Sequence, residues 1–342
     1  MMARVLFLVL AGTPLPPGKA DPLALNEAMK RFADEHVVTA KNPTIRLESL
    51  IRVVFSDAVL HLTYANGTKT AVETFESQSG NCLSFTNMFV ALARYAGLKA
   101  QFQEVRGVST WDRLGQLVVF NRHVNVVIRL NGQLFEVDFS PERTTRKRKS
   151  RIISDRRALA HYYNNKGAEL FAEDEPEQAL ALFELAMATD DSVAHIWANA
   201  GVIHSRLNRL EAAELCYRKA LLLEKHNYTA MTNLASVLAK QNRDDEAAVL
   251  LDRVDHWRRK NPFFHYERGQ AAFAQGRFEE AVVHFKRAIR RKPDEHDFYY
   301  ELARTYERLG REDKAATNLK KARRWAPDEA NRERFSQKPG ES

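Results

Sequence analysis

The chain has 342 residues, of which 44% are hydrophobic and 28% are charged, and it carries only 14 glycines. This composition excludes a disordered chain, and the length is sufficient for two domains that each bury a core. The net charge is +8, and the two cysteines, Cys82 and Cys216, are too few for a disulfide framework.

The N-terminal segment contains an apolar run from Val5 to Gly12, preceded by one arginine and followed by prolines toward Ala20. This is the outline of a signal peptide. We therefore assign residues 1–22 to a signal segment and expect a protein of the periplasm or cell envelope. The alternative is a frayed hydrophobic N-terminus on a cytoplasmic protein.

The stretch from Ser79 to Leu98 predicts a buried helix with a cysteine in its first turn. A small-residue loop precedes Cys82, and the helix that follows is apolar almost all the way round and stops at Gly97. The start of a helix offers unpaired N–H groups and the positive end of the helix dipole, which favour a thiolate. The alternative is that Cys82 is a small buried hydrophobe. A nucleophile also requires a base and a group that orients the base.

Two strand-like runs, His123–Leu130 and Gln133–Phe139, are joined by Asn131-Gly132 and predict a β-hairpin. The two-residue turn places Asn125 opposite Asp138, so His123 becomes a diagonal neighbour of Asp138 at roughly 7 Å. We expect the other face to be the core face, with the residues Val124, Val126, Ile128, Phe135, Val137 and Phe139. The hairpin would thus bury one side and display a His and Asp pair on the other.

These segments, G-N-C-L-S-F-T-N-M-F-V-A-L-A-R, R-H-V-N-V and E-V-D-F, resemble a bacterial transglutaminase-like domain, a relative of the papain-type fold. The resemblance implies an α+β domain over residues 23–158, in which the helix bearing the cysteine packs on an antiparallel sheet. It also implies a catalytic triad of Cys82, His123 and Asp138 with acyl-enzyme chemistry on an amide carbonyl. No cofactor or metal is expected. Whether water or an amine accepts the acyl group stays open.

Two further residues are candidates for the same site. Backbone N–H groups near Cys82 would hold the oxyanion, with Gln78 as a side-chain donor. The segment Gly107–Gly115 is expected to be a loop that forms one wall of the substrate site, with Trp111 at its tip.

A dense basic run extends from Arg143 to Arg151, and Arg156 and Arg157 follow it. Such a run can bind phosphate backbones or anionic lipids. Because it lacks interleaved aromatic residues and a recognisable nucleic-acid module, we interpret it as a solvated surface segment and expect no nucleic-acid partner.

The second half of the chain is self-similar at a period of 34 residues. Small residues recur at two positions of the period, and large residues recur at a third. The first small series is Gly167, Gly201, Ala235, Gly269 and Ala303, the second is Ala179, Ala213, Ala247, Ala281 and Ala315, and the large series is Phe183, Tyr217, Leu251, Phe285 and Leu319. Paired helices that stack as a solenoid produce this pattern.

A 34-residue period with this pattern resembles the tetratricopeptide repeat. It implies an all-α solenoid of five units over residues 160–329, followed by a polar tail over 330–342. The third unit is degenerate. The resemblance implies a groove for a protein or peptide partner, and Asn165, Asn199 and Asn233 recur at a position that tends to face it. The competing hypothesis is a non-catalytic scaffold that binds partners through this groove.

Overall fold

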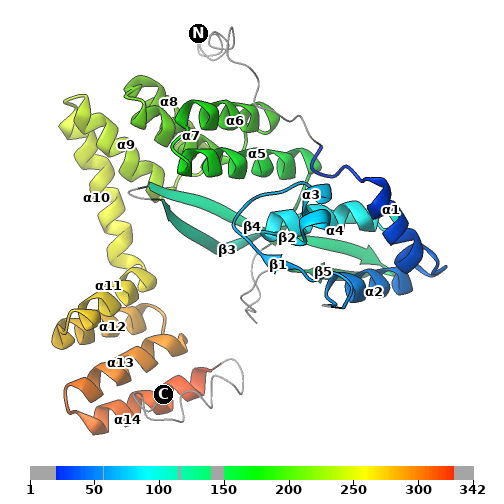
Figure 1. Cartoon of the computed structure of the whole chain (residues 1–342). Coiled ribbons are helices and arrows are strands. Elements are labelled where there is room, and N and C mark those ends of the chain that lie inside the picture. The colour runs from blue at the N-terminus through cyan, green and yellow to red at the C-terminus, as the bar shows by residue number, and fades with distance from the viewer. Residues whose placement is uncertain (1–20, 57, 115–116, 140–149, 327–342) are drawn as a thin grey trace. The chain divides into compact units, whose positions relative to one another are not determined.

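The computed structural model describes residues 21–56, 58–114, 117–139 and 150–326 (Figure 1). The predicted signal segment lies outside these residues except for its last two positions, and the polar tail lies outside them entirely. The chain forms two compact units divided between Arg243 and Asp244, and each is described by itself. Over the described ranges, no helix is long and apolar enough to cross a membrane.

The first unit begins with short helices and a small parallel pair of strands. Side-chain caps fix the helix starts, because Asn26, Asn42 and Thr70 each accept a backbone N–H of the first turn. The elements are α1 Glu27–Ala33, the π-helix η1 Asp34–Val38, α2 Pro43–Val54, β1 Thr63–Tyr64, α3 Ala71–Ser77 and β2 Ser79–Gly80.

Helix α4 spans Cys82–Tyr95 and forms the centre of this domain. Eleven consecutive residues, Leu83 to Ala93, are buried. The helix ends where Gly97 takes a left-handed conformation with φ of +77° and the Leu98 N–H bonds back to the Ala93 carbonyl. The predicted buried helix and its stop at Gly97 are confirmed.

A four-stranded antiparallel sheet has the order β5-β4-β3-β6. The strands are β3 Ala100–Leu114, β4 Leu117–Leu130, β5 Gln133–Val137 and β6 Ser150–Ile153. The turn residues Asn131 and Gly132 both have positive φ, as a type I′ turn requires. The predicted register is confirmed, since Leu130 pairs with Gln133 and Ile128 with Phe135.

Two expectations about this sheet are wrong. The predicted display face of β4 is itself buried, with His123 6%, Asn125 2% and Val127 1% exposed. Strand β4 is thus buried on both faces from His123 to Ile128, and helices α4 and α7 both contact it. Strand β5 stays largely exposed, with Leu134 at 46%. The segment expected to be a wall loop is instead strand as far as Leu114, since Trp111 lies within β3 and pairs with Phe120 of β4. The register shifts between Val105 and Ser109, and pairing with β4 then continues to Leu114. The role of Trp111 at a wall of the substrate site stays a prediction.

The remaining helices of the first unit follow the sheet, and Figure 1 shows α5 running beside β3. They are α5 Asp155–Ala172, α6 Pro176–Thr189, α7 Ala194–Arg206, α8 Leu210–Leu223 and α9 Tyr228–Lys240. Sequence neighbours pack against one another from α5 to α9. The predicted domain boundary at residues 158–160 falls inside α5. The boundary between the two compact units lies much later, after Arg243.

The second unit consists, over its described residues, of α10 Asp244–Lys260, α11 Pro262–Ala274, α12 Phe278–Arg291, α13 His296–Arg308 and α14 Glu312–Trp325. Its core is centred on Phe285, which is fully buried among residues of α11, α12 and α13. The α11–α12 and α13–α14 pairs supply the fourth and fifth predicted repeats.

The small and large positions of the repeat meet in space. A Cβ added to Gly201 would lie 2.7 Å from the Tyr217 ring, and one added to Gly269 would lie 2.6 Å from the Phe285 ring. Leu251, the large residue of the degenerate third repeat, is 43% exposed. The division after Arg243 falls between the two helices of that repeat.

Candidate functional site

Cys82 is the first residue of α4, and its side chain is partly exposed. Asn81 caps the helix by accepting the Ser84 N–H at 3.0 Å. The sulfur thus stands at the end of the helix where the dipole favours negative charge. Cys216 differs in every respect, since it lies inside α8 and burial raises the pKa of its thiol to about 12.

His123 and Asp138 form a direct contact. The Nε2 atom of His123 lies 2.6 Å from Oδ1 of Asp138, with His123 in β4 and Asp138 just after β5. Cys82 is a second hydrogen-bonding partner of the His123 ring. The structure therefore brings the three predicted residues together, although they lie 15 to 56 positions apart in the chain (138 − 123 and 138 − 82).

The environment of His123 favours its charged form. Burial by itself lowers the pKa of the imidazole, but the hydrogen bonds and charges of Asp138 and Cys82 outweigh it and raise the pKa from 6.5 to about 9. The ring is therefore an imidazolium at neutral pH. Asp138 keeps 42% of its side chain exposed, so one end of this group of three faces solvent.

The other two candidates for this site lie elsewhere or outside the described side chains. Gln78 ends α3 in a left-handed conformation, and its carbonyl accepts the Thr63 N–H at 2.9 Å. Its side-chain role therefore stays a prediction. The side chain of Trp111 lies outside the described part of the chain.

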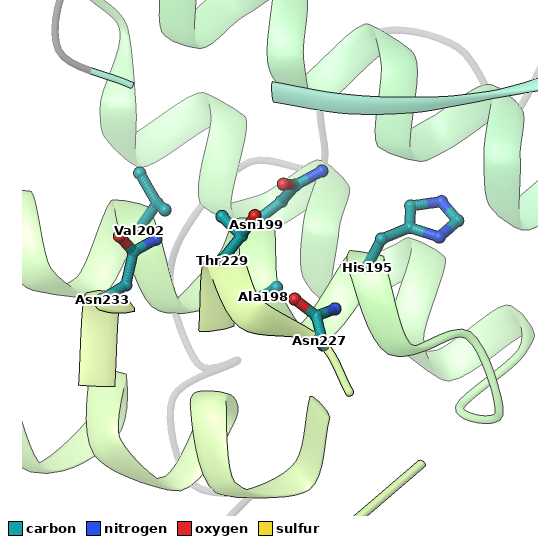
Figure 2. A pocket seen from close by; sticks show the side chains of 7 residues that line it. All are labelled: His195, Ala198, Asn199, Val202, Asn227, Thr229 and Asn233. Atoms are coloured by element: carbon teal, nitrogen blue, oxygen red, sulfur yellow. The ribbon is translucent and has the colours of Figure 1, made fainter. Parts of the chain in front are cut away.

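The three predicted partner-binding asparagines have unequal surroundings. Asn199 and Asn233 line a pocket between α7 and α9, together with His195, Ala198, Val202, Asn227 and Thr229 (Figure 2). Asn199 is 6% exposed, and its Nδ2 donates to Oδ1 of Asn164 at 2.9 Å. Asn165 lies on α5 and is not among the residues that line this pocket.

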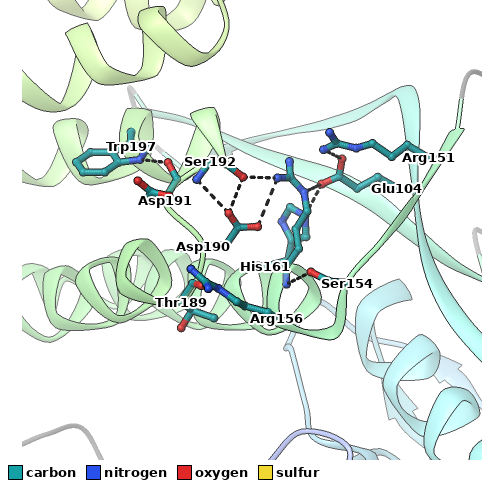
Figure 3. Close-up of polar contacts among 11 residues, drawn as sticks. Glu104, Arg151, Ser154, Arg156, His161, Thr189, Asp190, Asp191, Ser192 and Trp197 are labelled. Carbon is teal, nitrogen blue, oxygen red and sulfur yellow. Dashed lines mark hydrogen bonds and ion pairs between the residues drawn. The ribbon is translucent and has the colours of Figure 1, made fainter.

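Sequence reasoning missed a buried charge cluster at the contact between β3 and α5 (Figure 3). Glu104 of β3 has no exposed surface, yet its carboxylate contacts Arg157 Nε at 2.7 Å and His161 Nε2 at 2.7 Å. Arg151 of β6 bonds its other oxygen at 2.8 Å. Burial by itself would raise the pKa of Glu104, but His161 and Arg157 hold it well below its usual range.

The Glu104 cluster continues into the loop between α6 and α7. Arg157 also reaches Ser192 at 3.1 Å and Asp190 at 3.5 Å. The ring of His161 stacks on that of His195, with the centroids 5.1 Å apart. Two sequence signals were available for this cluster. Glu104 lies on the same strand face as the apolar residue Phe102, and Arg157 and His161 are four positions apart, on one face of a helix.

The cluster corrects the interpretation of the basic segment as solvated at one residue, Arg157. Its side chain is only 12% exposed and pairs with buried Glu104, whereas Arg151 pairs with the same carboxylate and stays 43% exposed. A buried carboxylate needs compensating cations, which explains why Arg157 lies inside. The rest of the run, residues 143–149, lies outside the described residues.

One group of side chains in the second unit has the composition of a metal site. Ligand atoms of Glu295, His296 and Asp297 lie within 4.8 Å of one another. Lys292, however, already forms an ion pair with Glu295. An ammonium group thus supplies the positive charge that a cation would bring, and these residues do not define a metal centre.

Comparison with known families agrees with this architecture. Residues 30–138 match the model of the transglutaminase-like superfamily. Three tetratricopeptide repeat models match residues 194–227, 229–254 and 272–334. The chain therefore carries a transglutaminase-like domain followed by tetratricopeptide repeats, as the sequence predicted. The fold class, an α+β domain followed by a helical solenoid, is confirmed.

The transglutaminase-like domain suggests a cysteine-type enzyme, and the tetratricopeptide repeats suggest protein binding. No curated protein matches the chain significantly.

Several solved repeat proteins are similar to part of the chain. YrrB, described as a TPR protein with an unusual peptide-binding site, is 25% identical over 52% of this chain and 91% of its own, with a TM-score of 0.28. A MamA crystal structure is 18% identical over 49% of this chain and 91% of its own, with a TM-score of 0.29. MamA from Desulfovibrio magneticus RS-1 is 19% identical over 50% and 96%, with a TM-score of 0.29.

Proposed function

We propose that this protein is a thiol-dependent acyl-transfer enzyme that acts on an amide carbonyl of a protein or peptide. The observation that carries the proposal is the contact of the His123 ring with Asp138 on one side and Cys82 on the other. A sulfur, a base and a group that orients the base are the parts that nucleophilic catalysis by cysteine requires.

In the proposed reaction, Cys82 and His123 form a thiolate–imidazolium pair, in which the thiol proton already resides on His123, and the thiolate attacks the carbonyl carbon. Backbone N–H groups in the first turn of α4, with the Gln78 side chain as a further donor, stabilise the negative oxygen of the tetrahedral intermediate. The imidazolium of His123 then protonates the departing amine, and a thioester with Cys82 remains. Asp138 holds the ring orientation throughout.

The second half of the cycle releases the acyl group. Neutral His123 removes a proton from water or from an amine, which attacks the thioester. Cys82 leaves as a thiolate, and its pair with the His123 imidazolium is restored. Water would yield a carboxylate and an amine would yield a new amide. We place Trp111 at one wall of the acyl site, where exclusion of water would select between these outcomes.

The repeats would hold the protein substrate or a partner. Asn199 and Asn233 line one pocket, and an asparagine side chain can both donate to and accept from the backbone of an extended peptide. We include Asn165 in this partner-binding surface because it occupies the equivalent position of the preceding repeat. The N-terminal apolar run from Val5 to Gly12 supports a location in the periplasm or cell envelope.

The central test is labelling of the full chain with an electrophilic peptide-like probe, followed by peptide mass mapping. We expect an adduct on Cys82 and none on Cys216, whose thiol is buried and has a pKa of about 12. His123→Ala should slow the labelling by about 100-fold or more, because positioned proton transfer contributes that much. Cys216→Ala is the matched control and should change nothing.

The same labelling reaction separates the repeats from the chemistry. Replacement of Asn165, Asn199 and Asn233 by alanine should weaken capture of a protein partner but leave the labelling rate of Cys82 unchanged. Lys240→Ala, an exposed change in the last turn of α9, is the control. Equal labelling of the two cysteines, or unaltered labelling in His123→Ala, would contradict the catalytic proposal.

A further inference from the structure

The start of the α4 helix is held by the loop of residues 66–69, which we term the cap loop. Asn81 donates from Nδ2 to the Thr68 hydroxyl at 2.7 Å, while its Oδ1 caps the helix. Ser84 accepts the Lys69 N–H at 2.9 Å. The same hydroxyl donates to the Gly67 carbonyl at 3.3 Å. Hydrogen bonds of Gly67, Thr68 and Lys69 therefore attach the cap loop to the turn that carries Cys82.

The cap loop is held in turn by the first repeat. The Thr68 N–H donates to Oε1 of Glu169 at 2.5 Å, across 101 positions of the chain. Glu169 lies on α5, and its other oxygen pairs with Lys166 at 3.0 Å. Thr68 is 2% exposed, so water does not supply a substitute acceptor. A buried N–H of the loop thus depends on a carboxylate of the repeats.

We propose that Glu169 is a positioning residue for the Cys82 thiol, an inference that rests on the nucleophilic role proposed for Cys82. Two hydrogen bonds connect the first repeat to the residue that precedes the cysteine, since the Thr68 N–H donates to Glu169 and Asn81 donates to the Thr68 hydroxyl. The orientation of the Asn81 side chain is fixed at both ends, by Thr68 and by Ser84. Movement of the cap loop would therefore reach the turn that aims the sulfur.

The packing at this turn leaves little room for the cap to relax. Gly80 lies against Ser84 so closely that a Cβ there would be 2.5 Å from the Ser84 Cβ, and Ser84 is fully buried. Close-packed regions pass displacements on, because their side chains have no vacant volume to enter. An error of about 1 Å at a catalytic atom can reduce a rate by about 100-fold.

Helix α5 is attached to the domain at a second place, near the proposed base His123. Arg157 and His161 of α5 bond to Glu104 of β3, and the next residue of that strand, Val105, pairs with His123. Helix α5 thus bonds to the cap loop that holds the Cys82 turn and to the strand that pairs with His123. An alternative role for Glu169 is simply to attach the repeat to the domain, which would change stability without changing the reactivity of Cys82.

The test measures the alkylation rate of Cys82 by iodoacetamide across pH, together with the thermal midpoint, in the full chain. Glu169→Ala should slow alkylation about five- to tenfold, the effect expected from loss of one buried hydrogen bond at the nucleophile's support. Glu169→Gln keeps an oxygen acceptor for the Thr68 N–H and should restore the rate to within about twofold. If Glu169 were purely structural, the alkylation rate would not recover in Glu169→Gln while its thermal midpoint stayed equal to that of Glu169→Ala.

Two controls separate the hydrogen bond from the charge. Lys166→Ala removes the ion pair but not the bond to Thr68, and Glu173→Ala removes an exposed carboxylate at the end of the same helix. Both should alkylate at the wild-type rate. If Glu169→Ala does not fold, Thr68→Val serves instead, because it deletes only the hydroxyl bonded to Asn81 and should slow alkylation similarly.

The outcomes distinguish this inference from the proposed function. A wild-type rate no higher than that of the chain in denaturant would contradict both. A raised wild-type rate that Glu169→Ala or Thr68→Val leaves unchanged would overturn the positioning role alone. Equal losses in Glu169→Ala and Lys166→Ala would also overturn it, since the effect would then follow the charge and not the bond to the cap loop.

Discussion

Two histidines of the first unit bond to carboxylates, and the exposure of the carboxylate separates their roles. His161 contacts Glu104, which has no exposed surface and two arginine partners. His123 contacts Asp138, which is 42% exposed. A fully enclosed charge cluster is suited to fixing a contact between elements, whereas a pair with one open side can meet a substrate. This contrast supports the proton-transfer role proposed for His123 and a structural role for His161.

The raised pKa of His123 predicts how stability depends on pH. The folded state holds the imidazolium more strongly than the unfolded chain, so this contribution is complete below pH 6.5 and is lost as pH rises through about 9. The unfolding midpoint in urea should fall across this window. His123→Gln should remove that part of the slope, as measured by urea titrations between pH 6 and 10. An unchanged slope in the variant would contradict the charged state assigned to His123.

The helix pair of each repeat is held by a small residue facing a large one. Gly201 of α7 lies against the ring of Tyr217 of α8, which is 1% exposed and has no space to withdraw into. The same arrangement joins Gly269 and Phe285 in the second unit. These glycines are therefore required by a close approach of two helices and not by their backbone conformation.

Gly201→Ala should destabilise the protein in spite of the higher helix propensity of alanine. Overpacking a filled core costs about 1–3 kcal/mol, and the gain in propensity returns about 1 kcal/mol. A second change, Tyr217→Leu, should recover part of the loss, since the fifth repeat combines Ala303 with Leu319 at these positions. Chemical denaturation of the single and double variants measures this coupling. Stabilisation by Gly201→Ala alone would show that the ring moves aside freely.

At the level of the whole molecule, the first repeat belongs physically to the transglutaminase-like domain. Helix α5 is buried on several sides, and Glu104 and Thr68 of that domain both bond to its side chains. The contacts divide the chain only after Arg243. A division at residues 158–160 would cut α5 and leave Glu104 without His161.

We therefore expect a fragment of residues 21–243 to fold cooperatively and to alkylate Cys82 at the wild-type rate. A fragment of residues 21–158 should lose about 3 kcal/mol or more of stability, because it removes a partner of a buried charge. Circular dichroism melts and iodoacetamide labelling of the two fragments compare them. Equal stability of the shorter fragment would show that the α5 contacts contribute nothing, and the domain boundary predicted at 158 would then be the physical one.

The sequence by itself determined the parts of this protein whose signals are local. The Asn131-Gly132 turn fixed the register that places His123 beside Asp138, a stop at Gly97 ended the buried helix that begins with Cys82, and a constant period revealed the repeats. Each of these follows from residues a few positions apart or from an exact recurrence, so no tertiary information was needed.

Only the tertiary structure decided how the two modules are joined. The bond from Thr68 to Glu169 spans 101 positions, and that from His161 to Glu104 spans 57. The patterns within single elements, Glu104 on the Phe102 face of β3 and Arg157 and His161 one helical turn apart, do not show that β3 and α5 meet. The burial of both faces of β4 was hidden for the same reason, because the enclosure of a strand depends on segments that are distant in the chain and near only in the fold.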